Sequence, residues 1–151
     1  MPRDSFSHST VVAAPRSKVW AALDLPETWN IAGVERVREP VIDEQGRLCG
    51  FTFDSVVGGV AYEGRATPHT RVEGEAMSWD IANSQVTGLL HIELEDADDG
   101  TTNMNVGVDI QSVGFLSAVF FGAIAKAVRD GLPRAAADLA SDLANRRGQR
   151  M

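Results

Sequence analysis

The stretch AAPRSKVWAALDLPETW, residues 13–29, sets a short apolar segment between two prolines close to the start of the chain. Pro15 suits the first turn of a helix, because a backbone N–H would find no helical partner there. Val19, Trp20 and Leu23 then lie on one apolar stripe of about two helical turns. The spacing predicts a short helix that buries this stripe.

The second proline of the stretch marks the end of that helix. The residue before Pro26 is driven out of the helical region, so the helix is predicted over residues 15–23. A further short turn is predicted over residues 27–31. The preceding residues 6–12 end in β-branched side chains and favour an extended conformation.

Beyond residue 34 the apolar pattern changes to short strands divided by turn signals. The alternation is clearest where Leu90, Ile92 and Leu94 alternate with polar neighbours, and it recurs between Met104 and Ile110. Such a period of two predicts antiparallel strands with one buried and one solvated face. We predict these strands over residues 34–43, 48–57, 60–70, 76–83, 90–95 and 103–110.

A helical period replaces the strand period over residues 114–146, where Pro133 is expected to kink or restart the helix. This helix alone is long enough to cover the apolar face of the sheet. The fold class is therefore α+β, a helix-grip fold: a curved antiparallel sheet of six or seven strands wrapped around a long C-terminal helix, with two short helices after strand 1. We expect a single domain over residues 1–151, with a core at 6–143 and a tail at 144–151.

Composition excludes several classes of protein. The net charge of −7 argues against a nucleic-acid binder, which needs a basic face. Cys49 is the only cysteine, so no intrachain disulfide can form. The first residues lack the apolar segment of a signal peptide, and the longest apolar run, 113–128, is too short to span a bilayer. The sequence thus predicts a cytoplasmic protein without stable membrane insertion.

The order of elements, together with the residues VVAAPRSKVWAAL, resembles the SRPBCC superfamily, also described as START-like, helix-grip or pollen-allergen-like. The family opens with a strand, an alanine-proline pair and a valine-tryptophan pair, here residues 14–15 and 19–20, followed by a further apolar residue, here Leu23. Trp29 fits the tryptophan that often follows the first short helices. The segment LHIELEDADDGTTNMNV, residues 90–106, is similar to the family's penultimate hairpin.

Within the superfamily, the chain looks most like the polyketide cyclase/dehydrase and lipid-transport group. The helix GFLSAVFFGAIAKAV is also similar to the branch of carbon monoxide dehydrogenase accessory proteins, but NIAGVER lacks that branch's Ile-Pro-Gly segment. The resemblance implies that a lipid, sterol, polyketide or other hydrophobic molecule binds between the helix and the sheet.

The candidate ligand-binding residues are those expected to point inward from the sheet and the helix. They are Phe51, Phe53, Tyr62, Trp79, Leu90, Ile92, Met104, Val106, Phe120 and His8. The alternative is that these side chains pack into a solid core. Small residues opposite large ones favour a cavity, since Gly64, Ala66, Ala123 and Ala127 leave room. Tyr62 and Trp79 carry polar groups that could orient a ligand.

No set of residues identifies a reaction or a cofactor. His8 is in phase with inward residues and is either a core histidine or a base, whereas His69 and His91 fall on solvated faces. The histidines lack metal-ligand spacing, so no metal site and no cofactor is predicted. Cys49 is in phase with Phe51 and is interpreted as a buried, small apolar residue.

One strand remains ambiguous. Over residues 34–43, either Arg36 and Arg38 or Glu35 and Glu39 share the face toward the cavity. Arginines inside would suit an acidic ligand.

Three functions follow from these observations. The leading one is binding of a small hydrophobic ligand without catalysis. The second is a polyketide aromatase/cyclase in which Tyr62 and His8 converge and move protons. The third is an accessory protein of the carbon monoxide dehydrogenase type. It would use the stripe at residues 115–124 against a partner, a membrane surface or a second copy, because Phe120 and Phe121 cannot both face the sheet.

Overall fold

The computed structural model describes residues 3–29, 34–57 and 60–149, and the side chains of all of these except 56–57, 60, 114–120 and 145–149. In chain order the elements are β1 (Arg3–Val12), α1 (Arg16–Ala22), the 3₁₀ helix η1 (Pro26–Trp29), β2 (Glu35–Ile42), β3 (Leu48–Val57), β4 (Val60–Val72), β5 (Ala76–Asn83), β6 (Val86–Asp96), the 3₁₀ turn η2 (Asp98–Gly100), β7 (Thr102–Ser112) and α2 (Gly114–Gln149).

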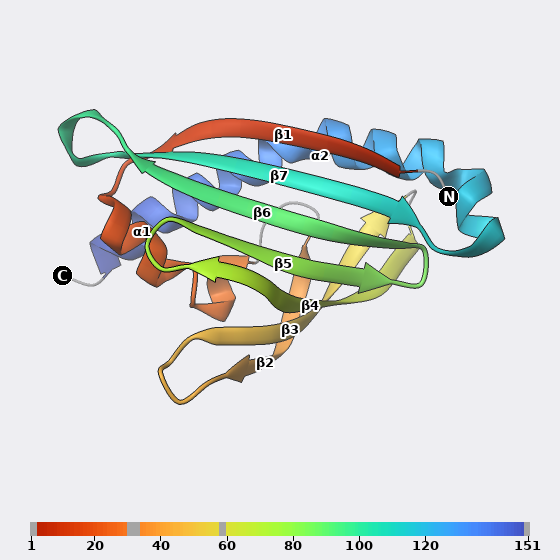
Figure 1. Cartoon of the computed structure of the whole chain (residues 1–151), viewed down its shortest axis with the longest axis horizontal. Coiled ribbons are helices and arrows are strands. Elements are labelled where there is room, and N and C mark those ends of the chain that lie inside the picture. The colour runs from red at the N-terminus through yellow and green to blue at the C-terminus, as the bar shows by residue number, and fades with distance from the viewer. Residues whose placement is uncertain (1–2, 30–33, 58–59, 150–151) are drawn as a thin grey trace.

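In the described part of the chain, seven strands form one antiparallel sheet in the order β1-β7-β6-β5-β4-β3-β2. Helix α2 crosses behind the sheet and runs from the end of β7 toward α1 (Figure 1). The predicted α+β helix-grip architecture is confirmed, and the sheet has the larger of the two predicted strand numbers. The core lies between the sheet and α2.

The first helices close one end of that core, as the opening stretch predicted. Val19 and Leu23 are fully buried, and Trp20 is nearly so. In η1, the indole N–H of Trp29 donates to the Leu23 carbonyl at 3.0 Å, and the Thr28 hydroxyl donates to a neighbouring carbonyl of α1 at 2.7 Å. These bonds satisfy buried polar groups and fix η1 against the end of α1.

Helix α2 continues through Pro133 as one element, so the expected restart is wrong. A proline removes one helical hydrogen bond and leaves the carbonyl four residues earlier without its donor. Pro133 and Arg129 are both exposed, so water can reach that carbonyl. Over the described residues, no helix is both long enough and apolar enough to cross a membrane.

Strand β2 is an irregular edge of the sheet. Its register against β3 shifts repeatedly, and Arg36 and Glu39 adopt positive φ angles of 52° and 53°. These are left-handed conformations that non-glycine residues seldom adopt. The bulges interrupt the ladder and turn the free edge away from regular pairing.

Candidate ligand-binding cavity

A cavity of about 260 Å³ lies between the inner face of the sheet and the middle of α2. Strands β3 to β7 and the 3₁₀ helix η1 form most of its wall, and residues between 124 and 139 of α2 form the rest. Alternation along the strands explains this wall, because Val106, Val108 and Ile110 of β7 all point to the same face.

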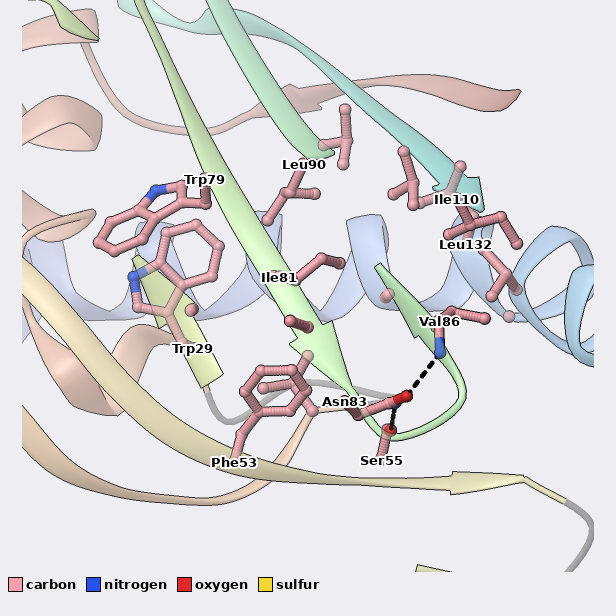
Figure 2. A pocket seen from close by; sticks show the side chains of 18 of the residues that line it. Trp29, Phe53, Ser55, Trp79, Ile81, Asn83, Val86, Leu90, Ile110 and Leu132 are labelled. Atoms are coloured by element: carbon pink, nitrogen blue, oxygen red, sulfur yellow. Dashed lines mark hydrogen bonds between the residues drawn. The ribbon is translucent and has the colours of Figure 1, made fainter. Parts of the chain in front are cut away.

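Four buried aromatic rings line the cavity from one end, where the two tryptophans lie, to Phe53 beside Asn83. Phe51 lies within 6.1 Å of Trp29, Trp79 and Phe53 when ring centroids are compared. Trp29 and Trp79 meet edge to face at 5.8 Å. Figure 2 shows the two tryptophans side by side, away from Ser55 and Asn83. Offset and edge-to-face contacts of this kind stabilise the packing of this wall.

Neither tryptophan has a free N–H for a ligand. The Trp79 indole donates to the Met77 sulfur at 3.2 Å, and the Trp29 indole is bound to the Leu23 carbonyl. The prediction that Trp79 could orient a polar group through its N–H is therefore not supported by the geometry.

The polar residues of the wall gather at the other end. Ser55 and Tyr62 are directly opposite one another in the β3–β4 ladder, and Asn83 ends β5 beside them. The Asn83 amide donates to the Ser55 hydroxyl at 3.4 Å, while its carbonyl oxygen accepts from the backbone N–H groups of Gln85 and Val86. Figure 2 shows the bonds of Asn83 with Ser55 and Val86 at the β5–β6 turn. None of the described residues forms a hydrogen bond with the Tyr62 hydroxyl.

No charged side chain lines the cavity in the described part of the chain. This finding resolves the ambiguity of residues 34–43, because neither the arginine pair nor the glutamate pair faces inward. Arg36 and Arg38 instead bind Asp54 on the outer face, at 2.8 and 3.1 Å. Only Val34, just before β2, contributes to the cavity from this segment.

Small residues leave room as predicted at two of four positions. Ala66 and Ala127 line the cavity, whereas Ala123 is exposed and does not. The space beside Gly64 is already occupied, since a Cβ there would lie 2.8 Å from the ring of Phe53. Because glycine has no side chain, the Phe53 ring lies across β4 at this position. The ring therefore occupies the space that Gly64 was expected to leave free.

The cavity brings together seven of the ten predicted residues, all of which lie on strands of the sheet. They are Phe51, Phe53, Tyr62, Trp79, Leu90, Ile92 and Val106. Met104 is fully buried but lies outside the cavity, in the solid core next to Leu94. The side chain of Phe120 lies outside the described residues.

His8 does not reach the cavity. It is half-buried on β1, opposite Val106, and three strands separate β1 from the strand that carries Tyr62. The proposed convergence of Tyr62 and His8 is therefore wrong. Strand phase placed His8 on the inner face, but it could not show that β1 lies at the far edge of the sheet.

At the polar end the prediction found Tyr62 but missed Ser55, Asn83 and Gln85, and it missed most of the helical wall. Ser55 was in phase with Phe51 and Phe53, so alternation carried enough signal to find it. Asn83 ends β5 in phase with Trp79 and Ile81, so alternation could also have found it, whereas Gln85 sits at a turn, where no periodicity indicates which side chains face inward. On α2, the missed residues are Ile124, Val128, Gly131, Leu132, Ala135, Ala136 and Leu139.

A network of charges fixes α1 to the sheet at the other end of the core. Asp24 binds the Arg71 guanidinium through both oxygens, at 3.0 and 2.9 Å. Arg71 lies 5.0 Å from the Trp20 ring centroid, and the Trp20 indole donates to Glu73 at 2.9 Å. Hydrogen bonds from Arg71 and then Trp20 lower the pKa of Glu73. This network holds α1 in place and lies outside the cavity.

The remaining candidate groups are not arranged for catalysis. Burial and the nearby Asp43 carboxylate raise the pKa of Cys49, so its thiol is a poor nucleophile. His69 and His91 lie on the outer face and bind Asp80 and Asp109, as the predicted solvated faces imply. Among the described side chains, no group of three potential ligands is placed to share a metal ion.

Comparison with known proteins shows similarity in fold and none in sequence. No family model matches the chain, and no curated protein is significantly similar to it. The Zhui aromatase/cyclase of Streptomyces sp. R1128 superposes with a TM-score of 0.78 at 14% identity, over 96% of both chains. A START superfamily protein of Mycobacterium smegmatis superposes at 0.69, with 13% identity, over 97% of this chain and 99% of its own.

A plant enzyme has the same architecture. Norcoclaurine synthase of Thalictrum flavum superposes at 0.67 with 13% identity, over 95% of this chain and 86% of its own. The chain therefore shares the helix-grip fold of these three proteins, which is the fold that the resemblance in residues 11–23 implied. At these identities the likeness establishes the fold, and function has to be argued from the cavity.

Proposed function

We propose that this protein binds a small hydrophobic molecule in the cavity between the sheet and α2. The observation that carries the proposal is a space of about 260 Å³ whose wall is apolar except for Ser55, Tyr62, Asn83 and Gln85. Ligand sites usually take this form, with mostly apolar walls and a few placed polar groups. Folds of this superfamily typically bind hydrophobic ligands, which supports the same conclusion.

Binding without catalysis fits the residues of the wall better than cyclisation does. The cyclase hypothesis required Tyr62 and His8 to act on one substrate, and His8 lies outside the cavity. The accessory-protein hypothesis rested on an exposed phenylalanine of α2. Phe121 is only 6% exposed and belongs to the core, whereas the side chain of Phe120 lies outside the described residues, so this hypothesis stays a prediction.

The experiment is a ligand panel read by native mass spectrometry and by thermal shift. The panel contains fatty acids, a sterol and small aromatic compounds, each tested against the wild type and two variants of α2. Ala135→Leu fills the cavity, whereas Ala137→Leu adds the same side chain on the exposed face of the helix. Binding that survives Ala137→Leu and is lost in Ala135→Leu supports the proposal. A panel with no binding to the wild type overturns it.

A further inference from the structure

The size of the cavity limits what it can hold. An engineered apolar cavity of about 150 Å³ binds benzene, which has six ring carbons. In the same proportion, the cavity of about 260 Å³ accommodates about ten ring carbons, the size of two fused rings. A sterol, with four fused rings and a tail, would have to extend beyond this volume, whereas a compact ligand fits within it.

The charge of the cavity limits the ligand further. Its wall carries no cationic side chain in the described residues, and the nearest arginines of the β2–β3 region, Arg36 and Arg38, bind Asp54 on the outer face. A ligand carboxylate in the cavity would lose its hydration without gaining an opposite charge. Burying such an unpaired charge is strongly unfavourable. The cavity therefore discriminates against fatty acids and aromatic acids.

Polar groups at one end give the ligand an orientation. Tyr62 lines this end, and no described residue binds its hydroxyl; the hydroxyl of Ser55 accepts from Asn83 and keeps its own proton available. A hydroxyl can both donate and accept, so this pair suits a ligand hydroxyl or carbonyl. The aromatic end offers no such group, because both indole N–H groups are already bound within the protein.

From these observations we infer that the cavity selects a neutral, compact ligand of about two fused rings, whose single hydroxyl or carbonyl group binds at the Ser55–Tyr62 end. The inference rests on the proposed function and narrows it. The rings lie against the wall formed by Trp29, Phe51, Phe53 and Trp79, and the polar group points toward the β5–β6 turn.

The test uses three probes of the same ring system: naphthalene, 2-naphthol and 2-naphthoate. Their dissociation constants are measured by calorimetry at pH 7, where the naphthoate is ionised. We expect 2-naphthol to bind about 2–10-fold more tightly than naphthalene, as one neutral hydrogen bond allows. The naphthoate is expected to bind at least about 100-fold more weakly than 2-naphthol, because its charge is buried without a partner.

Two variants locate the polar contact. Tyr62→Phe removes the hydroxyl while keeping the ring, and it should reduce the preference for 2-naphthol over naphthalene to about twofold or less. Ser7→Ala removes an exposed hydroxyl on β1 and should leave that preference unchanged. The melting temperature of each variant confirms that it folds. An undiminished preference in Tyr62→Phe, or tight binding of 2-naphthoate, overturns the inference.

A fatty acid and a sterol complete the probe set and separate the two levels of the proposal. If either binds and the naphthalene probes do not, the selection for compact neutral ligands is wrong while ligand binding stands. If no probe binds, the proposed function fails together with this inference.

Discussion

The space between the sheet and α2 has two ends that differ in packing. Toward α1, the core is solid: Val19, Leu23, Met104 and Leu143 are at most 1% exposed and none of them lines the cavity. Toward the β5–β6 turn, the same sheet and the same helix enclose about 260 Å³ of free space. One pair of surfaces thus produces both a packed core and a hollow.

The difference lies in the side chains that face each other. At the solid end, α1 contacts both α2 and β6, and large residues such as Leu94 and Met104 are fully or almost fully buried. At the hollow end, α2 presents small residues such as Gly131 and Ala135. A fold therefore fixes where a cavity can form, and residue size decides whether it stays open.

The largest expected effect is a difference between two identical truncations on β6. Leu94→Ala, at the solid end, should reduce the free energy of unfolding by about 2–5 kcal/mol, because it leaves a void in close packing. Leu90→Ala, in the cavity wall, should cost less than about 2 kcal/mol, since Leu90 already borders empty space. Urea denaturation of both variants measures the difference. Equal losses would mean that the cavity end is as tightly packed as the other.

A pair of enlargements on α2 tests the same contrast in the opposite direction. Ala140→Leu adds carbon atoms to the packed core and should lower the free energy of unfolding by about 1–3 kcal/mol. Ala135→Leu adds them to the cavity and should change it by about 0–2 kcal/mol in the stabilising direction. Denaturation curves for the two variants decide the point, and a marked destabilisation by Ala135→Leu would contradict an open cavity.

The charge network at the solid end should contribute stability in its own right. Arg71→Met removes the partner of Asp24, whose side chain is only 15% exposed, and should cost about 1–3 kcal/mol. The control, Lys126→Met, breaks an exposed ion pair with Asp130 on α2 and should cost at most about 0.5 kcal/mol. If the two variants melt at the same temperature, the network does not hold α1 in place.

The smallest effect is a pH dependence at the solid end. Hydrogen bonds from Arg71 lower the pKa of Glu73 below its ordinary value of 4.5, and the Arg47 backbone lowers the pKa of Asp43 below 3.8. Folding lowers both values, so this stabilisation is present above the ordinary pKa and is lost as the pH falls through the lowered one.

Urea denaturation between about pH 7 and pH 3 measures this loss. Glu73→Gln should weaken the decline of the unfolding free energy below about pH 4.5, whereas Glu95→Gln, at an exposed position of β6, should leave it as in the wild type. If the unfolding free energy declines equally with falling pH in the wild type and in both variants, Glu73 is not the group whose protonation causes the loss.

Local patterns determined most elements of this fold. Strands β3 and β5 begin and end where alternation predicted them, because their inward residues are apolar almost without interruption. Strand β6 begins at Val86, earlier than predicted, since Gly88 interrupts the apolar period. Between the predicted strands at 34–43 and 48–57 the chain turns, with Gly46 at a φ of 81° that glycine adopts without strain.

The sequence predicted residues of the site only where alternation along a strand indicates which side chains face inward. Phase assigned Phe51, Phe53, Tyr62 and Val106 to the inner face, where they line the cavity. Strand phase could not separate Met104 from Val106, because both side chains lie on the same face of β7. Met104 lies in the solid core, whereas Val106 lines the cavity. Strand phase also could not place Arg36, whose bulged strand breaks the period of two.

By itself the sequence determined which residues are buried, the order of helices and strands, and the resemblance to a helix-grip family, because periodicity and turn chemistry act between near neighbours. Tertiary structure alone decided which buried residues border empty space and which indole groups are already bound. It also placed three strands between the strands that carry His8 and Tyr62. These properties depend on volume and on contacts between segments far apart in the chain, and no local pattern encodes the gap left between two packed surfaces.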